Sequence, residues 1–279
     1  MHYQWASLTV ELRRRCNNRA ALSRGLDRIY SFDKLLSKSD NVDVYSVSRM
    51  EILLKPEKSD TYGTSLHYSG QSGDSYFEWQ NQFGIRSGII NARKFQNFIS
   101  SEDTILDFGC GGGHLLNAIK ARNKIGVEIN PVAIASARNY GFNIYESITD
   151  VKDASIDVAV SNHALEHVPY PISALREVYR VLKKDGRLVL CVPIDDWRNQ
   201  RKFSPDDINH HLNTWTPQLL GNSLSEAGFD VSTSDIKIFV GAWFRGTKYL
   251  WRFRRLFEAI SFVYGVIIKS RQIIVVVKK

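Results

Sequence analysis

The sequence predicts an α/β fold in which short strands alternate with helices around a sheet. Three observations predict it: a series of β-type runs from Thr104 onward, helical patterns between these runs, and a glycine-rich turn directly after the first run. Such alternation is typical of a parallel sheet built from βαβ units. With 279 residues, the chain is long enough to bury a full core.

Seven runs are expected to form the strands: Thr104–Phe108, Lys124–Ile129, Phe142–Tyr145, Ile156–Ser161, Arg187–Val192, Asp235–Val240 and Gln272–Val277. Helices are expected at His114–Ala121, Pro131–Tyr140, Ile172–Leu182 and Thr216–Gly228. Pro131 fits the first turn of its helix, and Gly141 fits a helix stop. Between Pro193 and the fourth helix, a polar, charged stretch without periodicity predicts a long loop of the kind that often covers a site.

The first hundred residues have few β-type runs and contain arginine-rich helical stretches. We expect an N-terminal helical cap or lid over residues 1–100 and a cofactor-binding domain over residues 101–279. Within the cap, Ser59–Ser75 is expected to be a loop. The aromatic stretch Tyr76–Trp79 belongs either to the core of the cap or to an apolar wall of the site.

The positive charge of the chain is concentrated at its C-terminal end. The net charge is +8, and residues 241–279 hold nine Lys/Arg and one Asp/Glu. This pattern indicates local attraction to anionic lipid, phosphate or a partner, and it makes nucleic acid a less favoured partner. We expect a basic aromatic helical insertion at residues 241–270, before the last strand. Residues 249–269 predict peripheral membrane contact, the rival being a cap helix that buries its aromatic side chains.

The cysteines and the N-terminal residues indicate the compartment. Three cysteines without CxxC or CxxH spacing predict neither a disulfide framework nor a cysteine-zinc site. The first residues lack the apolar stretch of a signal peptide, and no run reaches the roughly 18 apolar residues that a membrane span needs. We expect a cytoplasmic protein that is peripheral to a membrane at most.

A glycine loop follows the first expected strand and opens a helix. Asp107 precedes the glycines of residues 109–113, and Glu128 ends the next expected strand. In an open α/β sheet, both features lie at the carboxyl ends of the strands, where an acid can bind the ribose hydroxyls of a nucleoside cofactor. A dinucleotide loop has the pattern GxGxxG, and His114 replaces its third glycine. Asp107 suits a cationic cofactor and disfavours a pyrophosphate, so we predict S-adenosylmethionine (SAM) rather than NAD.

Three segments, ILDFGCGGG, GVEINP and SIDVAVSNHALEHVPYPISALREVYRVLKKDGRLVLCVP, resemble the class I SAM-dependent methyltransferases with small acceptors, of the type 11/23 kind. The resemblance covers residues 104–240 and implies a Rossmann-like seven-stranded sheet. It also implies that Asp107, Gly109 and Gly111 bind the methionine part of SAM, that Glu128 binds the ribose and that Ile129 packs on the adenine. Cys110 contributes backbone and packing to the loop. The acid that receives the adenine amino group stays open between Glu146 and Asp150.

Acceptor-side candidates lie on the loops after the fourth and fifth strands. Asn162 and His163 face the methyl group and are counted with the cofactor-binding residues, and further candidates are Glu166, His167, Asp206, Asp207, His210 and His211. We predict that His210 or His211 is the catalytic base, without a metal, because neutral imidazole suits proton removal near pH 7. The alternative is a metal site. The segment His163–His167 resembles the ExxEH metal arrangement of small-RNA 2′-O-methyltransferases and of some quinone-pathway O-methyltransferases, with His163 in place of the first carboxylate, and a softer ion such as zinc or nickel would suit it.

The predicted function is SAM-dependent O-methylation of a small or carrier-linked hydroxylated acceptor, for example a sugar in polysaccharide biosynthesis. The (Asn/Asp)-Pro-Pro-(Tyr/Phe) sequence that the resemblance would require for methylation of adenine or cytosine amino groups is absent after the fourth strand. Two rivals remain open: a methyltransferase-like subunit that binds SAM without catalysis and, with less support, an NAD-dependent oxidoreductase. Neither the acceptor nor the oligomeric state follows from the sequence.

Overall fold

The computed structural model describes residues 65–68, 70–196, 198, 200–241 and 253–279. The chain divides into two units, Met1–Pro56 and Glu57–Lys279, and all described residues belong to the second. The arginine-rich stretches expected to be helical before residue 57 therefore lie outside the described residues. So do residues 249–252, which begin the segment expected to contact a membrane.

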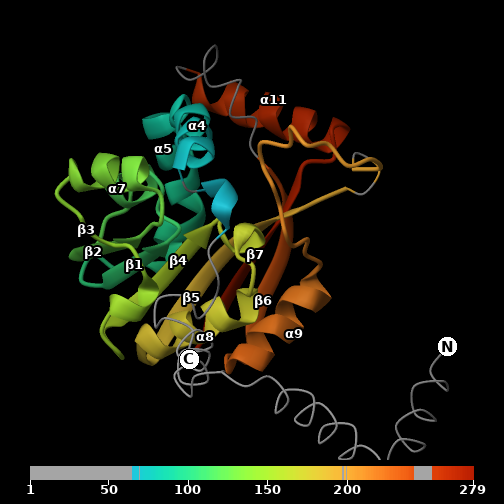
Figure 1. The fold of residues 1–279 in the computed structure, drawn as a ribbon. Helices are drawn as coiled ribbons and strands as arrows, with labels where there is room; N and C mark the ends of the chain where they lie inside the picture. The colour runs from blue at the N-terminus through green and yellow to red at the C-terminus, as the bar shows by residue number, and fades with distance from the viewer. Residues whose placement is uncertain (1–64, 69, 197, 199, 242–252) are drawn as a thin grey trace, which may run out of the picture. The chain divides into compact units, whose positions relative to one another are not determined.

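A seven-stranded sheet forms the centre of the described unit, which confirms the predicted fold class (Figure 1). Its strands are β1 (Thr104–Phe108), β2 (Asn123–Val127), β3 (Asn143–Tyr145), β4 (Ile156–Asn162), β5 (Leu182–Ile194), β6 (Asp230–Val240) and β7 (Arg271–Lys278). Their order is β3-β2-β1-β4-β5-β7-β6. The first five are parallel, while β7 runs antiparallel to both β5 and β6. The carboxyl ends of β1, β2, β4 and β5 therefore meet at one edge.

Helices cover both faces of the sheet. The described helices are α4 (Gly70–Asn81), α5 (Gly84–Phe95), α6 (His114–Ala118), α7 (Pro131–Arg138), α8 (Pro171–Val181), α9 (Pro217–Ala227) and α11 (Arg254–Ile267). Single 3-10 turns are η1 (Leu66–Tyr68), η2 (Gln96–Phe98), η3 (Ile148–Asp150) and η4 (Leu165–His167). Side chains of α8 and α9 join one core cluster with the sheet. Side chains of α5, α6 and α7 join another.

Local sequence signals explain several of these boundaries. Asn130 caps α7, because its side-chain oxygen accepts from the backbone N–H groups of Val132 and Ala133, and Pro131 occupies the first turn. Gly141 has a φ of +82°, as expected of a glycine after a helix. Thr216 caps α9 in the same way by accepting from Leu219 N.

Several expected boundaries were wrong. Strand β6 begins at Asp230 rather than at Asp235, and α6 ends at Ala118 rather than at Ala121. The loop expected at Ser59–Ser75 gives way to η1 and to α4, which begins at Gly70. Tertiary packing explains this helix: a Cβ on Gly73 would lie 2.3 Å from the carbonyl oxygen of Tyr68, so only glycine allows the close approach, while Phe77 is buried. Strand β5 begins at Leu182 rather than at Arg187.

Helix α11 lies between β6 and β7 in the sequence and crosses beyond the end of β6 at Val240 (Figure 1, red). A Cβ on Gly265 would lie 2.3 Å from Val240 Cγ1, so this glycine lets the helix approach the strand closely. Arg93 of α5 reaches Glu258 of α11 at 2.7 Å. None of the described helices is long and apolar enough to cross a bilayer.

Candidate functional site

The glycine loop after β1 is shaped by contacts that only glycine permits. Gly109, Gly111 and Gly113 all have positive φ values, between +52° and +79°. The amides of Gly109 and Cys110 both donate to the carbonyl of Val127, which ties the loop to the end of β2. A Cβ on Gly109 would lie 2.3 Å from the Cβ of Ala164. The loop backbone therefore borders a cavity at a distance that side chains would not allow.

Glu128 lies at the end of β2 and is held by backbone donors. Its carboxylate accepts from the amides of Gly111, Ile129 and Asn130 at 2.8–2.9 Å. Burial raises the pKa of Glu128, and these three N–H donors oppose that shift. Glu128 and Ile129 line a cavity with Gly109 and Gly111. The carboxylate is thus fixed in orientation beside the place where a ligand's hydroxyls would lie.

Asp107 has a different environment, because it is buried without a partner. Its side chain is 1% exposed, and neither carboxylate oxygen has a hydrogen-bond donor among the described residues. Burial and the nearby Glu128 raise the pKa of Asp107 to about 8. Oδ1 of Asn91 is another buried oxygen without a hydrogen-bond donor among the described residues, and Asn91 lines the same cavity as Asp107. A buried carboxylate without a donor is costly, so Asp107 is suited to accept a hydrogen bond from a cationic group of a ligand.

These features fit SAM. The ammonium group of its methionine part would supply the donor that Asp107 and Asn91 lack, and its ribose hydroxyls would meet the fixed carboxylate of Glu128. Cys110, also predicted to be in the loop, lines the cavity beside Asp107 and directs its thiol toward the carbonyl of Gly111 at 3.6 Å. Glu146 and Asp150 are exposed and do not line this cavity or the one beside Glu128, so the adenine acid stays unassigned.

Residues of η1 and α4 close the cofactor cavity from the other side. Tyr68, Tyr76, Phe77 and Gln80 line it together with the predicted residues. The hydroxyl of Tyr68 lies 2.5 Å from Nδ1 of His167 and also donates to the carbonyl of Asn209. Of the aromatic stretch Tyr76–Trp79, Tyr76 and Phe77 therefore form part of the wall. Tyr68 and Asn91 were not found from the sequence, because no motif marks them and only the fold brings them to the cavity.

A second cavity opens next to the first and shares Tyr76, Gln80, His163 and His167 with it. Its other walls include Trp79, Asn162, Glu166 and His211, and α11 contributes Tyr264 and Gly265. Lys94, which is partly buried, holds Asn162: its ammonium donates to Asn162 Oδ1 at 3.3 Å and to Gln272 Oε1 at 3.0 Å. Lys94 is a further residue that sequence patterns did not indicate.

The structure separates the two adjacent histidines of the long loop. His211 lines the second cavity, and its Nδ1 lies 2.9 Å from Asp195 Oδ2. Burial would lower the pKa of His211, but the contact with Asp195 outweighs it and raises the pKa. His210 is exposed and stacks on His67, with ring centroids 4.5 Å apart. Asp206 and Asp207 are exposed as well.

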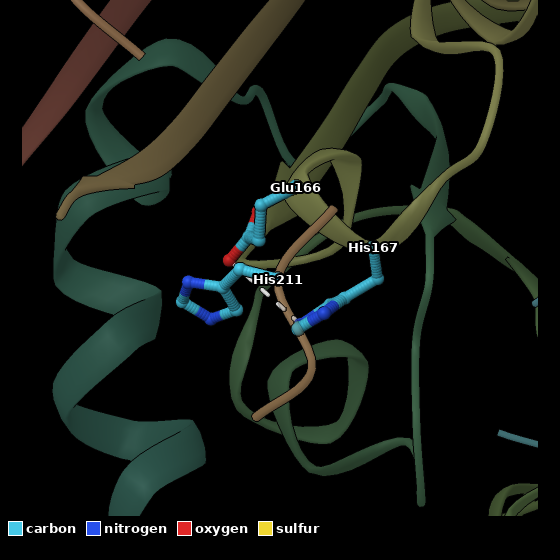
Figure 2. A group of neighbouring side chains, drawn as sticks. All are labelled: Glu166, His167 and His211. Atoms are coloured by element: carbon cyan, nitrogen blue, oxygen red, sulfur yellow. Dashed lines mark ion pairs between the residues drawn. The ribbon is translucent and has the colours of Figure 1, made fainter. Parts of the chain in front are cut away.

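Glu166 and His167 lie beside His211 (Figure 2), and His163 lies close to Glu166. Glu166 is fully buried, with Oε1 3.4 Å from His163 Nδ1 and 3.9 Å from His167 Nε2. Burial lowers the pKa of His167 to about 4 although Glu166 opposes that shift. His163 has a φ of +57° and its amide donates to the carbonyl of Cys191. The predicted acceptor-side residues of η4 thus meet one member of the histidine pair.

Comparison with curated proteins gives partial matches. The chain is 36% identical over 105 residues to an uncharacterised methyltransferase of Schizosaccharomyces pombe, a match that covers 33% of this chain and 40% of that protein. It is 32% identical over 98 residues to a ubiquinone biosynthesis O-methyltransferase of Pseudomonas aeruginosa, covering 31% and 42%. The matches therefore span about two fifths of the length of these relatives.

Solved structures share the fold. A SAM-dependent methyltransferase from Archaeoglobus fulgidus aligns with a TM-score of 0.53 at 19% identity, over 73% of this chain and 99% of that chain. A phosphoethanolamine N-methyltransferase of Haemonchus contortus in complex with SAM aligns with a TM-score of 0.54 at 12% identity, over 76% and 59%.

A family model described as a methyltransferase domain matches residues 85–234, more than half of the chain. The matched residues include the glycine loop and Glu128. They also include His163, Glu166, His167 and His211. The chain therefore belongs to the methyltransferase domain family.

Proposed function

We propose that this methyltransferase transfers the methyl group of SAM to a hydroxyl of a small or carrier-linked acceptor. One observation carries the proposal: the cavity next to the cofactor cavity holds the His211 imidazole with Asp195 behind it. Methyl transfer from a sulfonium is an in-line displacement, and a hydroxyl acceptor, unlike a thioether or a neutral amine, must lose its proton. The similarity to ubiquinone biosynthesis O-methyltransferases supports the same reaction class.

For SAM binding, we propose the cofactor-binding residues predicted from the sequence, together with Asn91. Asp107 and Asn91 receive the ammonium group of SAM, Glu128 receives the ribose hydroxyls and Ile129 packs on the adenine. The backbone of residues 109–111, Cys110 included, borders the methionine part. Asn162 and His163, which line the second cavity and the edges of the cofactor cavities, flank the methyl group.

Of the predicted pair His210 and His211, we propose His211 as the base that accepts the proton of the acceptor hydroxyl. Its ring lines the cavity, whereas the ring of His210 is turned to His67. The sugar acceptor suggested from the sequence gains no support from the described residues, and we leave the acceptor at the level of a hydroxylated compound.

We further propose that the acceptor is presented at an anionic membrane surface or on a lipid carrier. Within α11, Phe257, Ser261 and Gly265 form a narrow buried stripe. Apolar side chains on the rest of the helix are exposed, with Phe262 at 59% and Ile267 at 71%. This exposure disfavours the rival in which a cap helix buries its aromatics. Exposed apolar side chains beside a basic segment suit the interface of an anionic bilayer, and the acceptor cavity adjoins the same helix.

The reaction is tested by the formation of S-adenosylhomocysteine from SAM with a panel of hydroxylated acceptors, each with and without an apolar tail. We expect turnover with a hydroxylated acceptor and, at a SAM concentration that just saturates the wild type, much slower turnover in the Glu128→Ala variant. SAM binding without turnover on any hydroxyl, amine or thiol acceptor would favour a cofactor-binding subunit without catalysis. Turnover confined to amines would contradict O-methylation.

Sedimentation with vesicles of phosphatidylserine and phosphatidylcholine tests the membrane surface. We expect binding at low salt, reduced in an α11 variant with Phe262→Ser and Ile267→Ser. Leu219→Ser on α9 is a matched control, because Leu219 is also exposed at 50% and lies on a different helix. Equal sedimentation of the α11 variant and the control variant would contradict the proposal.

A further inference from the structure

Lys94 of α5 is a cation whose ammonium is held by side chains of the sheet. It donates to Oδ1 of Asn162 at 3.3 Å and to Oε1 of Gln272 at 3.0 Å, and Sγ of Cys191 lies 3.7 Å away. The centroid of the Phe239 ring is 5.4 Å from the same nitrogen. These contacts come from β4, β7, β5 and β6, which are neighbours in the sheet, so the fold assembles the surroundings of this charge.

Lys94 has no carboxylate partner among the described residues, because its contacts are two amide oxygens, a thiol and a ring. Burial lowers the pKa of this ammonium. The two nearby acids, in contrast, each have a histidine. Glu166 Oε1 lies 3.4 Å from Nδ1 of His163, and Asp195 Oδ2 lies 2.9 Å from Nδ1 of His211. A charge that is removed from water needs a counter-charge, and Lys94 is the group that lacks one here.

The ammonium also fixes the orientation of the two amide side chains. An ammonium group only donates, so the oxygens of Asn162 and Gln272 face Lys94 and their NH2 groups turn away from it. Neither NH2 group donates to an acceptor among the described residues. Gln272 is 6% exposed, and both amides line the second cavity, which is the acceptor cavity of the proposed function. A Cβ on Gly241, another lining residue, would lie 3.1 Å from Nε2 of Gln272. Two amide donors therefore border the cavity, with a cation behind them.

The rest of the acceptor cavity suits a small ring compound. Tyr76, Trp79 and Phe83 give part of its lining an aromatic surface, and His211 lines it as well. Its volume is about 460 Å³, which is within the range of small-molecule sites. The cavity thus combines a base, an apolar surface and a pair of amide donors.

We infer that Asn162, Gln272 and Lys94 form an anion subsite, so that the acceptor is a hydroxylated compound carrying a carboxylate or phosphate group. The inference rests on the proposed function, in which His211 takes the proton of the acceptor hydroxyl. The anionic oxygens accept from the two NH2 groups, and their charge balances that of Lys94. Lys94 does not line the cavity, so it acts as a positioning and specificity residue through the amides.

The expected size of the effect follows from the geometry. One amide group with a hydrogen bond on each side separates the ammonium from the anion by about 6 Å. At an effective dielectric constant of about 20, this attraction tightens binding by roughly 10–100-fold.

Calorimetric titration of the enzyme saturated with S-adenosylhomocysteine tests the subsite without turnover. The probes are two matched pairs: meta-hydroxybenzoate with meta-hydroxybenzamide, and para-hydroxyphenyl phosphate with hydroquinone. We expect one of the anionic probes to bind at least about 10-fold more tightly than its neutral partner, and the pair with the larger ratio distinguishes carboxylate from phosphate. In Lys94→Met this preference should vanish, while the affinity for S-adenosylhomocysteine stays close to that of the wild type.

Gln272→Glu separates the loss of charge balance from the loss of fold. The new carboxylate has the shape of the amide and pairs with Lys94, so the variant should unfold at a temperature no lower than the wild type and yet lose the preference for anions. Cys191→Ala is the matched control. This thiol is also a contact of Lys94 but does not line the cavity, so the variant should bind the anionic probes at least as tightly as the wild type.

Equal binding of the anionic and neutral probes in the wild type, or an equal preference in wild type and Gln272→Glu, overturns the inference. A preference lost in Cys191→Ala as fully as in Lys94→Met would assign the effect to packing and would overturn it too. If the preference is absent while a neutral hydroxylated acceptor is methylated, the inference fails and the proposed function stands. A preference for anions without methylation of any hydroxyl supports the subsite and contradicts O-methylation.

Discussion

The candidate site at the carboxyl edge of the sheet has two halves that are built in different ways: the cofactor half beside Asp107 and Glu128, and the acceptor half beside His211. On the cofactor half, the glycine loop and Glu128 lie within 20 residues of each other in the chain, and backbone amides fix the geometry. On the acceptor half, side chains do the orienting: Lys94 and Tyr68, which are distant in the chain, hold Asn162 and His167. Asp195, 16 residues before His211, holds that imidazole. A backbone-built site has a short sequence pattern, whereas a site built from long-range side-chain contacts has none.

The largest effect on the free energy of unfolding is expected from Gly109→Ala, which changes the glycine loop of the cofactor half. The new Cβ would lie 2.3 Å from the Cβ of Ala164 at a residue with a φ of +77°. Left-handed strain and overpacking together should lower the free energy of unfolding by about 2–4 kcal/mol. Urea denaturation measures this decrease in the free energy of unfolding. Gly141→Ala is the matched control, since it has a φ of +82° and open space around it, and should cost about 1–2 kcal/mol.

His211→Ala changes the acceptor half and should lower turnover without changing the affinity for SAM. Because His211 is the proposed base, we expect turnover to fall by about 100-fold or more. SAM affinity should stay unchanged, because His211 does not line the cofactor cavity. Steady-state kinetics and calorimetry on the same preparation measure both quantities. A parallel loss of SAM affinity would show that the halves are not independent.

Glu128→Ala should weaken SAM binding with little change in stability. Loss of a hydrogen-bonding carboxylate costs about 1.5–3 kcal/mol, or roughly 10–150-fold in affinity. The removal frees three backbone amides that water can reach from the cavity, so the fold should survive. Glu102→Ala, an exposed acid before β1, is the control. Calorimetric titration that gives wild-type affinity for Glu128→Ala would remove this residue from the cofactor site.

The same contrast explains what could be predicted from the sequence. Strand β1, the glycine turn that follows it and the place of Glu128 at the end of β2 were correctly predicted, because apolar runs and glycine spacing report local backbone geometry. The role of Glu128 in binding the ribose stays a prediction. Tyr68, Asn91 and Lys94 were missed, because their roles come from where α5 and η1 pack. The base role of His210 or His211 stays a prediction, and the adjacency of the two histidines in the chain could not indicate that the His211 ring, not the His210 ring, lines the cavity.

The free protein should also respond to pH through Asp107. Its pKa is raised to about 8 in the folded state, whereas the unfolded state ionises near the ordinary value of 3.8. Between these values the folded state binds more protons, so Asp107 should make the free energy of unfolding fall as pH rises from about 4 to about 8. Asp107→Asn should flatten this part of the pH profile. A profile that is equally steep in wild type and variant would contradict the raised pKa.

The most direct measurement of the central claim counts the protons released when SAM binds. If the buried Asp107 carboxylate receives the cationic amino group of SAM, it must ionise on binding at a pH below about 8. Calorimetric titration near pH 6.5 in two buffers of different ionisation enthalpy gives this number. We predict that the wild type releases about one proton more than Asp107→Asn, which binds SAM more weakly. Equal proton release and equal affinity in the two proteins would contradict the assignment of the orphaned carboxylate to the cofactor.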